Sequence, residues 1–183
     1  MSKILGLDIS TSITGVAIVD SDVEIDDKGS HILLLEAIEF KKCKTLWEKA
    51  DVVQEYFNVL SSKFSFLPDR ILVEEPLMSF RPGMSSAQTI SSLIRFNGIV
   101  SFLARSVLRQ EPEFVSAAHA RKLCGIKLQK TGVAGPQKAQ VFKHMSENDL
   151  KHVVWPLKKS GKIVDWASDA TDAYVIACSG IKE

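Results

Sequence analysis

Three apolar, β-prone segments dominate the first part of the chain. The segments 3–7 and 14–19 are separated by polar residues, which predicts a hairpin that turns near Ser10–Ser12. An acidic stretch, 20–29, contains a turn signal and leads into a third apolar run at 31–40. This pattern predicts three consecutive strands that pair as an antiparallel meander.

Beyond position 40, apolar residues recur at helical spacing and alternate with short apolar runs. The spacing predicts helices over 45–63, 85–108, 118–123, 137–146 and 165–179, and strands over 70–73 and 113–116. The glycine-containing basic segment 125–135 is predicted to be a loop. Because helices connect the later strands, these strands should pair in parallel. The predicted fold class is therefore α/β, with a mixed five-stranded sheet (an antiparallel three-strand meander plus parallel strands) flanked by helices.

The composition is that of a packed domain that needs no disulfide bonds for stability. The 183 residues are 45% hydrophobic and 25% charged, and no linker rich in Pro, Gly or Ser divides them, so we predict a single domain over residues 1–183. No apolar run approaches the ~18–20 residues of a membrane span, and the N-terminus lacks the apolar core of a signal peptide. Cys43, Cys124 and Cys178 are widely spaced, which is typical of a reducing compartment. We therefore expect a cytoplasmic protein with no membrane partner.

Charge is distributed unevenly along the chain. Between His119 and Lys162 there are ten basic and two acidic residues, a net charge of +8, whereas the remaining 139 residues carry 13 basic and 20 acidic groups, a net charge of −7. Such a basic stretch is typical of a surface that binds a polyanion such as nucleic acid. A solvated lysine-rich surface is an equally good interpretation of charge alone.

Acidic residues stand where acids are unusual. Asp8 and Glu74 each end an apolar strand, and open sheets of this type bind ligands outside their strand ends, although a lone strand-end aspartate is more often a turn former. In the last predicted helix, Asp165, Asp169 and Asp172 fall on one face, where like charges repel unless a cation neutralises them. We interpret Asp165 as the helix N-cap and the other two as ligands.

Converging carboxylates predict a metal site. Carboxylate oxygens suit Mg²⁺ or Mn²⁺ better than zinc, and the sequence holds no HExxH motif or paired Cys/His set. Two such ions roughly 4 Å apart can activate a water and stabilise the leaving oxygen in phosphodiester hydrolysis. Small residues at 170, 173 and 177 would let the last helix approach the sheet closely. Together with the basic stretch, the carboxylates predict a nuclease.

The same motifs, in this order, resemble those of the RuvC family of Holliday-junction resolvases. They are Ile4-Leu-Gly-Leu-Asp8 with Thr14-Gly-Val-Ala-Ile, Val73-Glu74-Glu-Pro-Leu-Met78, and Ser168-Asp169-Ala-Thr-Asp172-Ala-Tyr-Val-Ile-Ala. The segments Ala117-Ala-His-Ala-Arg-Lys122 and Gln137-Lys138-Ala-Gln-Val141 resemble the family's substrate-binding region. The resemblance spans nearly the whole chain.

This resemblance implies an RNase H-like fold and a Mg²⁺-dependent endonuclease that resolves four-way DNA junctions by paired symmetric cuts, leaving ligatable 5′-phosphate nicks. It implies about two Mg²⁺ ions per active site, with Mn²⁺ able to substitute. It also implies a homodimer on branched DNA, in a bacterial cytoplasm or a virus-infected host cell. The implied catalytic and metal-binding carboxylates are Asp8, Glu74, Asp169 and Asp172, and the candidate DNA-binding residues are Lys122, Lys138, Arg121, Lys127 and Lys130.

The chain departs from the family pattern at two places. Ile9-Ser10 stands where the family has Pro-Gly, and Glu75-Pro76-Leu77 stands where it has Gln-Val-Phe. The second change removes the aromatic residue that opens the junction centre, so Leu77 or Phe80 becomes the candidate substitute. The predicted helix 85–108 is more apolar than one sheet face can bury, which makes it a candidate dimer interface, with plain core packing as the alternative.

Three other functions fit part of the pattern. The segment 8–15 resembles the first phosphate loop of sugar-kinase and Hsp70-like ATP-binding domains, but such proteins need a second domain and a second glycine-rich loop, which this chain lacks. The complete set of four acids argues against a protein that binds junctions without cleaving them. A metal nuclease acting on other branched DNA or on RNA–DNA hybrids stays open.

Overall fold

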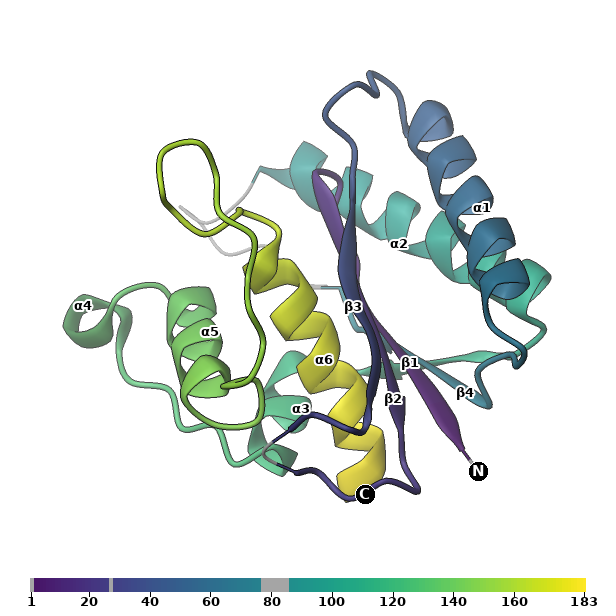
Figure 1. Cartoon of the computed structure of the whole chain (residues 1–183). Helices are drawn as coiled ribbons and strands as arrows, with labels where there is room; N and C mark the ends of the chain where they lie inside the picture. The colour runs from purple at the N-terminus through teal and green to yellow at the C-terminus, as the bar shows by residue number, and fades with distance from the viewer. Residues whose placement is uncertain (1, 27, 77–85) are drawn as a thin grey trace.

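The structure, a computed structural model, describes residues 2–26, 28–76 and 86–183. Within these residues, five strands form one mixed sheet in the order β3-β2-β1-β4-β5 (Figure 1). The strands are β1 (Lys3–Asp8), β2 (Ile13–Asp20), β3 (Ile32–Glu39), β4 (Arg70–Glu74) and β5 (Pro112–Val115). Strands β1, β2 and β3 pair antiparallel, whereas β4 pairs parallel with both β1 and β5. The predicted meander and the predicted parallel pairs are therefore confirmed.

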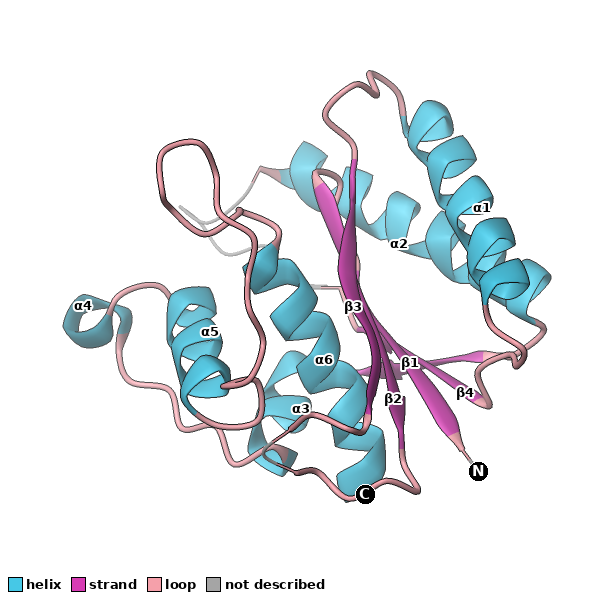
Figure 2. Cartoon of the chain, viewed as in Figure 1, coloured by secondary structure: helices cyan, strands magenta, loops and turns pink. Residues whose placement is uncertain are grey.

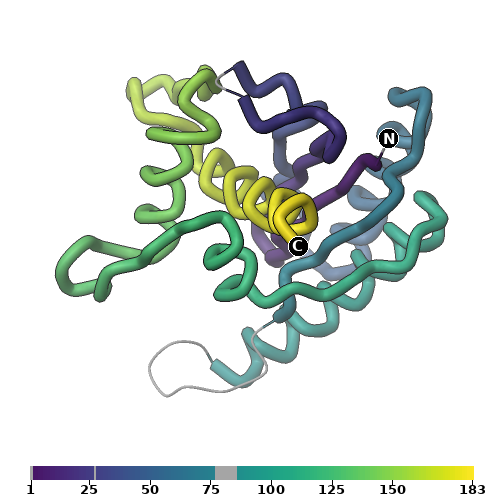
Figure 3. The backbone as a smooth tube through the Cα atoms, turned by 90° about the horizontal axis from the view of Figure 1, so that it is seen from below, coloured from purple at the N-terminus to yellow at the C-terminus, as the bar shows by residue number. Residues whose placement is uncertain are grey.

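Helices cover both faces of the sheet (Figure 2). On one face lie α1 (Leu46–Lys63) and α2 (Ala87–Leu108), and on the other lie α3 (Ala117–Leu123), α5 (Gln137–Glu147) and α6 (Ala167–Lys182). Figure 3 shows α6 between the strands and the α3–α5 segment. The predicted fold class, a mixed sheet flanked by helices, is confirmed.

Two apolar cores fill the space on the two sides of the sheet. Leu5 and Leu7 of β1 belong to the core under α1 and α2, whereas Ile4 belongs to the core under α6. Successive side chains of a strand point to opposite faces, so Asp8 is directed to the α6 side. The same alternation in β4 places Leu72 in the α6 core and directs Glu74 to that side.

Two predicted details are wrong. Helix α6 begins at Ala167 after Trp166, so Asp165 is not its N-cap; its carboxylate instead accepts a hydrogen bond from Lys158 Nζ at 2.5 Å. The segment predicted to be a loop over 125–135 contains a one-turn helix, α4 (Thr131–Ala134), and Gly135, the residue that follows it, takes a positive φ of 78°. Neither change alters the order of the main elements.

Other expectations on the surface and the thiols can be compared directly with the structure. Cys43, Cys124 and Cys178 are all free thiols. Among the described residues, none of the helices has the length and apolarity that crossing a bilayer requires.

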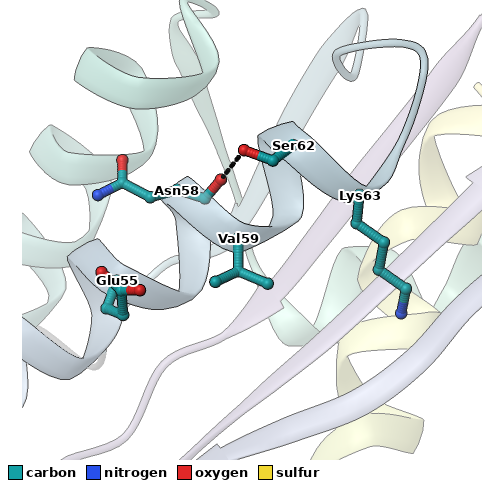
Figure 4. Close-up of a pocket in the computed structure, with 5 residues that line it drawn as sticks. All are labelled: Glu55, Asn58, Val59, Ser62 and Lys63. Carbon is teal, nitrogen blue, oxygen red and sulfur yellow. Dashed lines mark hydrogen bonds between the residues drawn. The ribbon is translucent and has the colours of Figure 1, made fainter.

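One surface pocket, lined by Glu55, Asn58, Val59, Ser62 and Lys63, lies entirely on α1 (Figure 4). Because α1 covers the face opposite α6, this pocket is separated from the predicted carboxylates by the sheet.

Candidate active site

Two of the predicted carboxylates lie side by side at one edge of the sheet. In the parallel pair β1–β4, Leu7 is opposite Val73, so the next residues, Asp8 and Glu74, are neighbours at the carboxyl ends of the two strands. Both side chains are directed to the α6 face by the strand alternation. Buried Asn97 of α2 donates a hydrogen bond from Nδ2 to the Glu74 carbonyl at 3.2 Å, which holds the end of β4 in place.

Helix α6 supplies the other two carboxylates because it packs directly on the strands. A Cβ at Gly15 would lie 2.0 Å from the Asp169 carbonyl oxygen, and a Cβ at Gly6 would lie 2.2 Å from the Ala173 carbonyl oxygen. Glycine is therefore required at both strand positions for the helix to sit this close. The predicted close approach through small residues is confirmed, and it buries Asp169 and Asp172 against the strand ends.

Lys138, in the first turn of α5, joins these carboxylates. Its Nζ lies 2.6 Å from Asp169 Oδ1, 3.3 Å from Asp8 Oδ2 and 3.4 Å from Asp172 Oδ2. Burial lowers the pKa of this ammonium, but the charges of the three aspartates outweigh that effect and hold the pKa above its usual value. Three carboxylates from β1 and α6 therefore converge on one cationic atom.

The cluster carries more negative charge than its surroundings compensate. Burial raises the pKa of both Glu74 and Asp172 above the usual carboxyl range, and the charge of Asp8 raises both further. Arg121 opposes the shift in each case. Strongly perturbed carboxyl groups at a sheet edge are typical of a functional site. We call Asp8, Glu74, Asp169 and Asp172 the carboxylate cluster.

The donor chemistry of the cluster suits a hard divalent cation, but its present arrangement does not. Carboxylate oxygens are the ligands that Mg²⁺ and Mn²⁺ prefer. In the part of the chain that the structure describes, however, no group of three or more His, Cys, Asp or Glu side chains is placed so that it could hold a metal ion. The cation at the centre of this arrangement is the Lys138 ammonium.

The predicted DNA-binding residues fall into three groups. Lys138 lies inside the cluster rather than on the surface around it. Arg121 acts electrostatically on Glu74 and Asp172, and it lines a surface pocket together with Lys122 and Lys127. Lys130 is exposed where α4 begins. The predicted substitutes for the missing aromatic, Leu77 and Phe80, lie outside the described residues.

A second basic region lies at this edge, and only the part that comes from the predicted basic stretch 119–162 was identified from the sequence. Residues 156–164 form a hairpin in which Leu157 bridges Ile163, and its tip holds exposed Lys158, Lys159 and Lys162. The loop between β3 and α1 carries exposed Lys41, Lys42 and Lys44, followed by Trp47, which is 73% exposed. The pKa of Asp165 is lowered mainly by the hydrogen bond from Lys158 and further by the charge of Lys41. Lysines from both segments therefore act on the same carboxylate. Figure 1 shows both where β1 ends.

We call these two segments the lysine rim. A local signal existed for both. Three lysines within four residues stand shortly before an exposed tryptophan in one segment, and Lys-Lys-Ser-Gly-Lys occurs in the other. Buried Asn97 was also missed, although an amide within an apolar helical stripe indicates a polar partner.

No protein-family model matches the sequence, and no curated protein matches it. Solved structures do match. Thermus thermophilus RuvC superimposes with a TM-score of 0.58 at 16% identity, covering 98% of this chain and 93% of that one. T. thermophilus RuvC in complex with a Holliday junction substrate superimposes with a TM-score of 0.62 at 14% identity, with the same coverage. Fowlpox virus resolvase with substrate Holliday junction DNA covers 98% of this chain and 97% of that one at 16% identity, with a TM-score of 0.46. The chain thus has the RNase H-like fold of RuvC, as its motifs implied.

Proposed function

We propose that this chain is a divergent, metal-dependent endonuclease that resolves four-way DNA junctions. The observation that carries the proposal is the carboxylate cluster, in which acids from β1, β4 and α6 meet at one edge of a RuvC-like sheet. Buried acids that repel each other weaken a fold, so their convergence indicates a functional role. The solved complex of T. thermophilus RuvC with its Holliday junction substrate supports branched DNA as the substrate class.

The cofactor we propose is Mg²⁺, about two ions per site, with Mn²⁺ able to substitute. Such ions supply an activated water and stabilise the leaving 3′ oxygen of a phosphodiester, so the cut strands would carry 5′ phosphates. The cluster residues Asp8, Glu74, Asp169 and Asp172 would hold them once the cluster opened. Arg121 stands close enough to lower the carboxyl pKa values and is a candidate contact for a DNA phosphate.

Basic residues around the cluster supply the attraction for DNA. Lys122 and Lys127 lie on the α3 side of the cluster, and the lysine rim lies where β1 ends. Phosphate contacts by lysine and arginine dominate nucleic-acid affinity and position the backbone. Flanking groups of lysines on two sides of a cleavage site fit a substrate whose arms leave in different directions.

We also propose a symmetric homodimer that uses α2. One side of this helix is buried in the core through Phe96, Val100 and other residues, whereas Ile94, Gly98 and Phe102, spaced four apart, lie exposed on another side. Phe102 is 63% exposed, and a side chain at Gly98 would meet open space. Since a four-way junction is two-fold symmetric, an isologous dimer would present one active site to each of two strands.

The dimer proposal is tested by Phe102→Glu, which places a charge at the more exposed end of this stripe. We expect sedimentation analysis to give a dimeric mass for the wild type and a monomeric mass for the variant. The variant should nick one strand of a junction at a time. Lys63→Glu, an exposed change on α1, is the matched control. A monomeric wild type that cuts both strands together would contradict this proposal.

The nuclease proposal is tested by incubating the wild type with Mg²⁺ and a labelled four-way junction, a three-way branch, a linear duplex and an RNA–DNA hybrid. We expect paired, symmetric nicks in the junction only, sealable by ligase, and no cleavage by Glu74→Gln despite retained junction binding. Single or asymmetric cuts on the three-way branch or the hybrid would instead support a related metal nuclease. Cleavage by Glu74→Gln at the wild-type rate would show that the cluster is not the active site.

A further inference from the structure

Lys138 has an unusual position for a residue of a basic DNA-binding stretch. Its Nζ lies within 3.4 Å of carboxylate oxygens from Asp8, Asp169 and Asp172, whose side chains are only 13%, 12% and 8% exposed. An ammonium that pairs with three carboxylates at once has little capacity left to bind a DNA phosphate. The Lys138 ammonium lies where three carboxylate oxygens converge, a position suited to a cation.

Lys138 is freer to move than the three carboxylates that it contacts. Asp169 and Asp172 stand on α6, whose backbone is held against the sheet at Gly6 and Gly15, and Asp8 ends a central strand. Lys138 instead reaches the cluster through a flexible four-carbon stem. It starts from the first turn of α5, which has no side-chain cap, and its own side chain is 42% exposed. If a second cation enters, the group that can leave is therefore the lysine.

A divalent ion and the Lys138 ammonium also require the same oxygen atoms. Both are attracted by Asp8 Oδ2, Asp169 Oδ1 and Asp172 Oδ2, and both are cations, so they repel each other at close range. This accounts for the finding that the described residues hold no ready arrangement of three acidic ligands for a metal. The carboxylates are closed around the lysine.

We propose that Lys138 is an internal counter-ion that fills the carboxylate cluster in the metal-free protein and competes with the divalent metal for it. The inference rests on the proposed metal-dependent function and adds a regulatory step to it. Lys138 holds Asp8, Asp169 and Asp172 together without metal, and metal binding releases its ammonium toward the solvent side of the cluster. Because Lys138 neutralises part of the negative charge of the cluster, the cluster binds a metal more weakly than the carboxylates alone would.

The first test compares Lys138→Met with Lys143→Met. Both lysines are on α5 and both substitutions remove one charge, but Lys143 is 74% exposed and its ion pair is with Glu147, outside the cluster. Calorimetric titration with Mn²⁺, in the absence of DNA, should give Lys138→Met a dissociation constant at least about tenfold lower than that of the wild type. The Lys143→Met value should equal the wild-type value.

The second test needs no substitution and so stays valid if Lys138→Met does not fold. Reductive methylation of the wild type, followed by mass spectrometry, measures how accessible each lysine amine is. We expect Lys138 to be methylated several-fold faster in Mn²⁺ than in EDTA, with Lys143 methylated equally in both. An unchanged Lys138 rate, in a protein shown by calorimetry to bind Mn²⁺, would overturn the proposal.

The outcomes separate this inference from the proposed function. Equal or weaker Mn²⁺ binding by Lys138→Met would overturn the competition while leaving a metal-dependent nuclease in place. If neither the wild type nor the variant binds Mn²⁺, both the competition and the metal-dependent function are wrong. Tighter binding by Lys138→Met, with an unchanged control, supports both.

Discussion

Helix α6 carries two buried polar clusters, and they are built on opposite principles. Its first half contributes Asp169 and Asp172 to the carboxylate cluster, where like charges meet a single ammonium. Two residues after Asp172, the helix contributes Tyr174, whose hydroxyl lies 2.7 Å from His31 Nε2 and donates to Asp149 Oδ2 at 3.4 Å. Both clusters are enclosed by the same sheet and the same helix, so the difference lies in their chemistry.

The tyrosine cluster, formed by His31, Tyr174 and Asp149, is a chain of complementary partners. Burial lowers the pKa of His31 and raises the pKa of Tyr174, so both groups stay neutral near pH 7. The Tyr174 hydroxyl is paired with both His31 and Asp149, which replaces its bonds with water, whereas buried His31 Nδ1 has no hydrogen-bond partner among the described residues. The carboxylate cluster cannot be balanced in this way. If the proposed function is correct, the tyrosine cluster serves stability, whereas the carboxylate cluster reduces stability in exchange for a role in metal binding.

The largest expected effect is that of a substitution in the carboxylate cluster. Asp172→Asn should reduce junction cleavage at least about a thousandfold, because it removes a ligand charge at the proposed active site. The same change should raise the unfolding temperature in EDTA by about 2–4 °C per kcal/mol of relieved repulsion. Parallel cleavage assays and thermal unfolding check both. If the variant loses both activity and stability, Asp172 contributes to the stability of the fold, contrary to this prediction.

Tyr174→Phe should show the opposite pattern. It removes the hydroxyl between His31 and Asp149 and leaves buried polar atoms unpaired, which costs about 1–3 kcal/mol. Denaturant unfolding should measure this loss, while the cleavage rate at a temperature well below the transition should stay near that of the wild type. If cleavage falls as strongly as in Asp172→Asn, the two clusters are not functionally separate.

Alanine substitutions at the lysine rim should have a smaller effect, confined to DNA binding. Lys159→Ala and, on the α3 side, Lys122→Ala should each weaken junction binding. Each should also reduce the slope of log affinity against log salt by about 0.9 for every phosphate that the lysine neutralises in the wild type. Lys63→Ala, on α1 and behind the sheet, is the control. An unchanged slope would assign the substituted lysine to the solvated surface.

The smallest expected effect is a pH dependence that arises from the tyrosine cluster. Because the folded-state pKa of His31 lies below its usual value of 6.5, the unfolded chain binds a proton more readily. Stability contributed by neutral His31 is therefore complete above pH 6.5 and declines as the pH falls from there through the lowered pKa. Glu74 and Asp172, whose raised pKa values act in the opposite direction in this pH range, are present in both the wild type and a His31→Gln variant. The His31 contribution should therefore appear as the difference between their unfolding free energies, measured from about pH 7.5 to about pH 5. A difference that does not change with pH would exclude this histidine as a source of pH dependence.

Much of the candidate site follows from local sequence. The two-residue alternation of apolar positions directs Asp8 and Glu74 to one face, and parallel pairing makes strand-end residues neighbours. The helical spacing of Asp169 and Asp172, with alanines at 170, 173 and 177, predicts an acidic face that packs closely on the strands. These features depend on residues within one element or on its neighbours, so periodicity reveals them. The metal ions, the dimer and the cleavage products stay predictions.

Only the tertiary structure decides which distant groups meet. Lys138 is 130 residues from Asp8 in sequence, and His31 is 143 residues from Tyr174. Charge counting identifies Lys138 as basic but not as the partner of three acids, because that depends on how α5 packs beside α6. The ion pair of Lys158 with Asp165 likewise overrides the local N-cap signal at the start of α6. Local patterns specify faces, whereas the balance of charge inside the site arises from long-range packing that no single segment encodes.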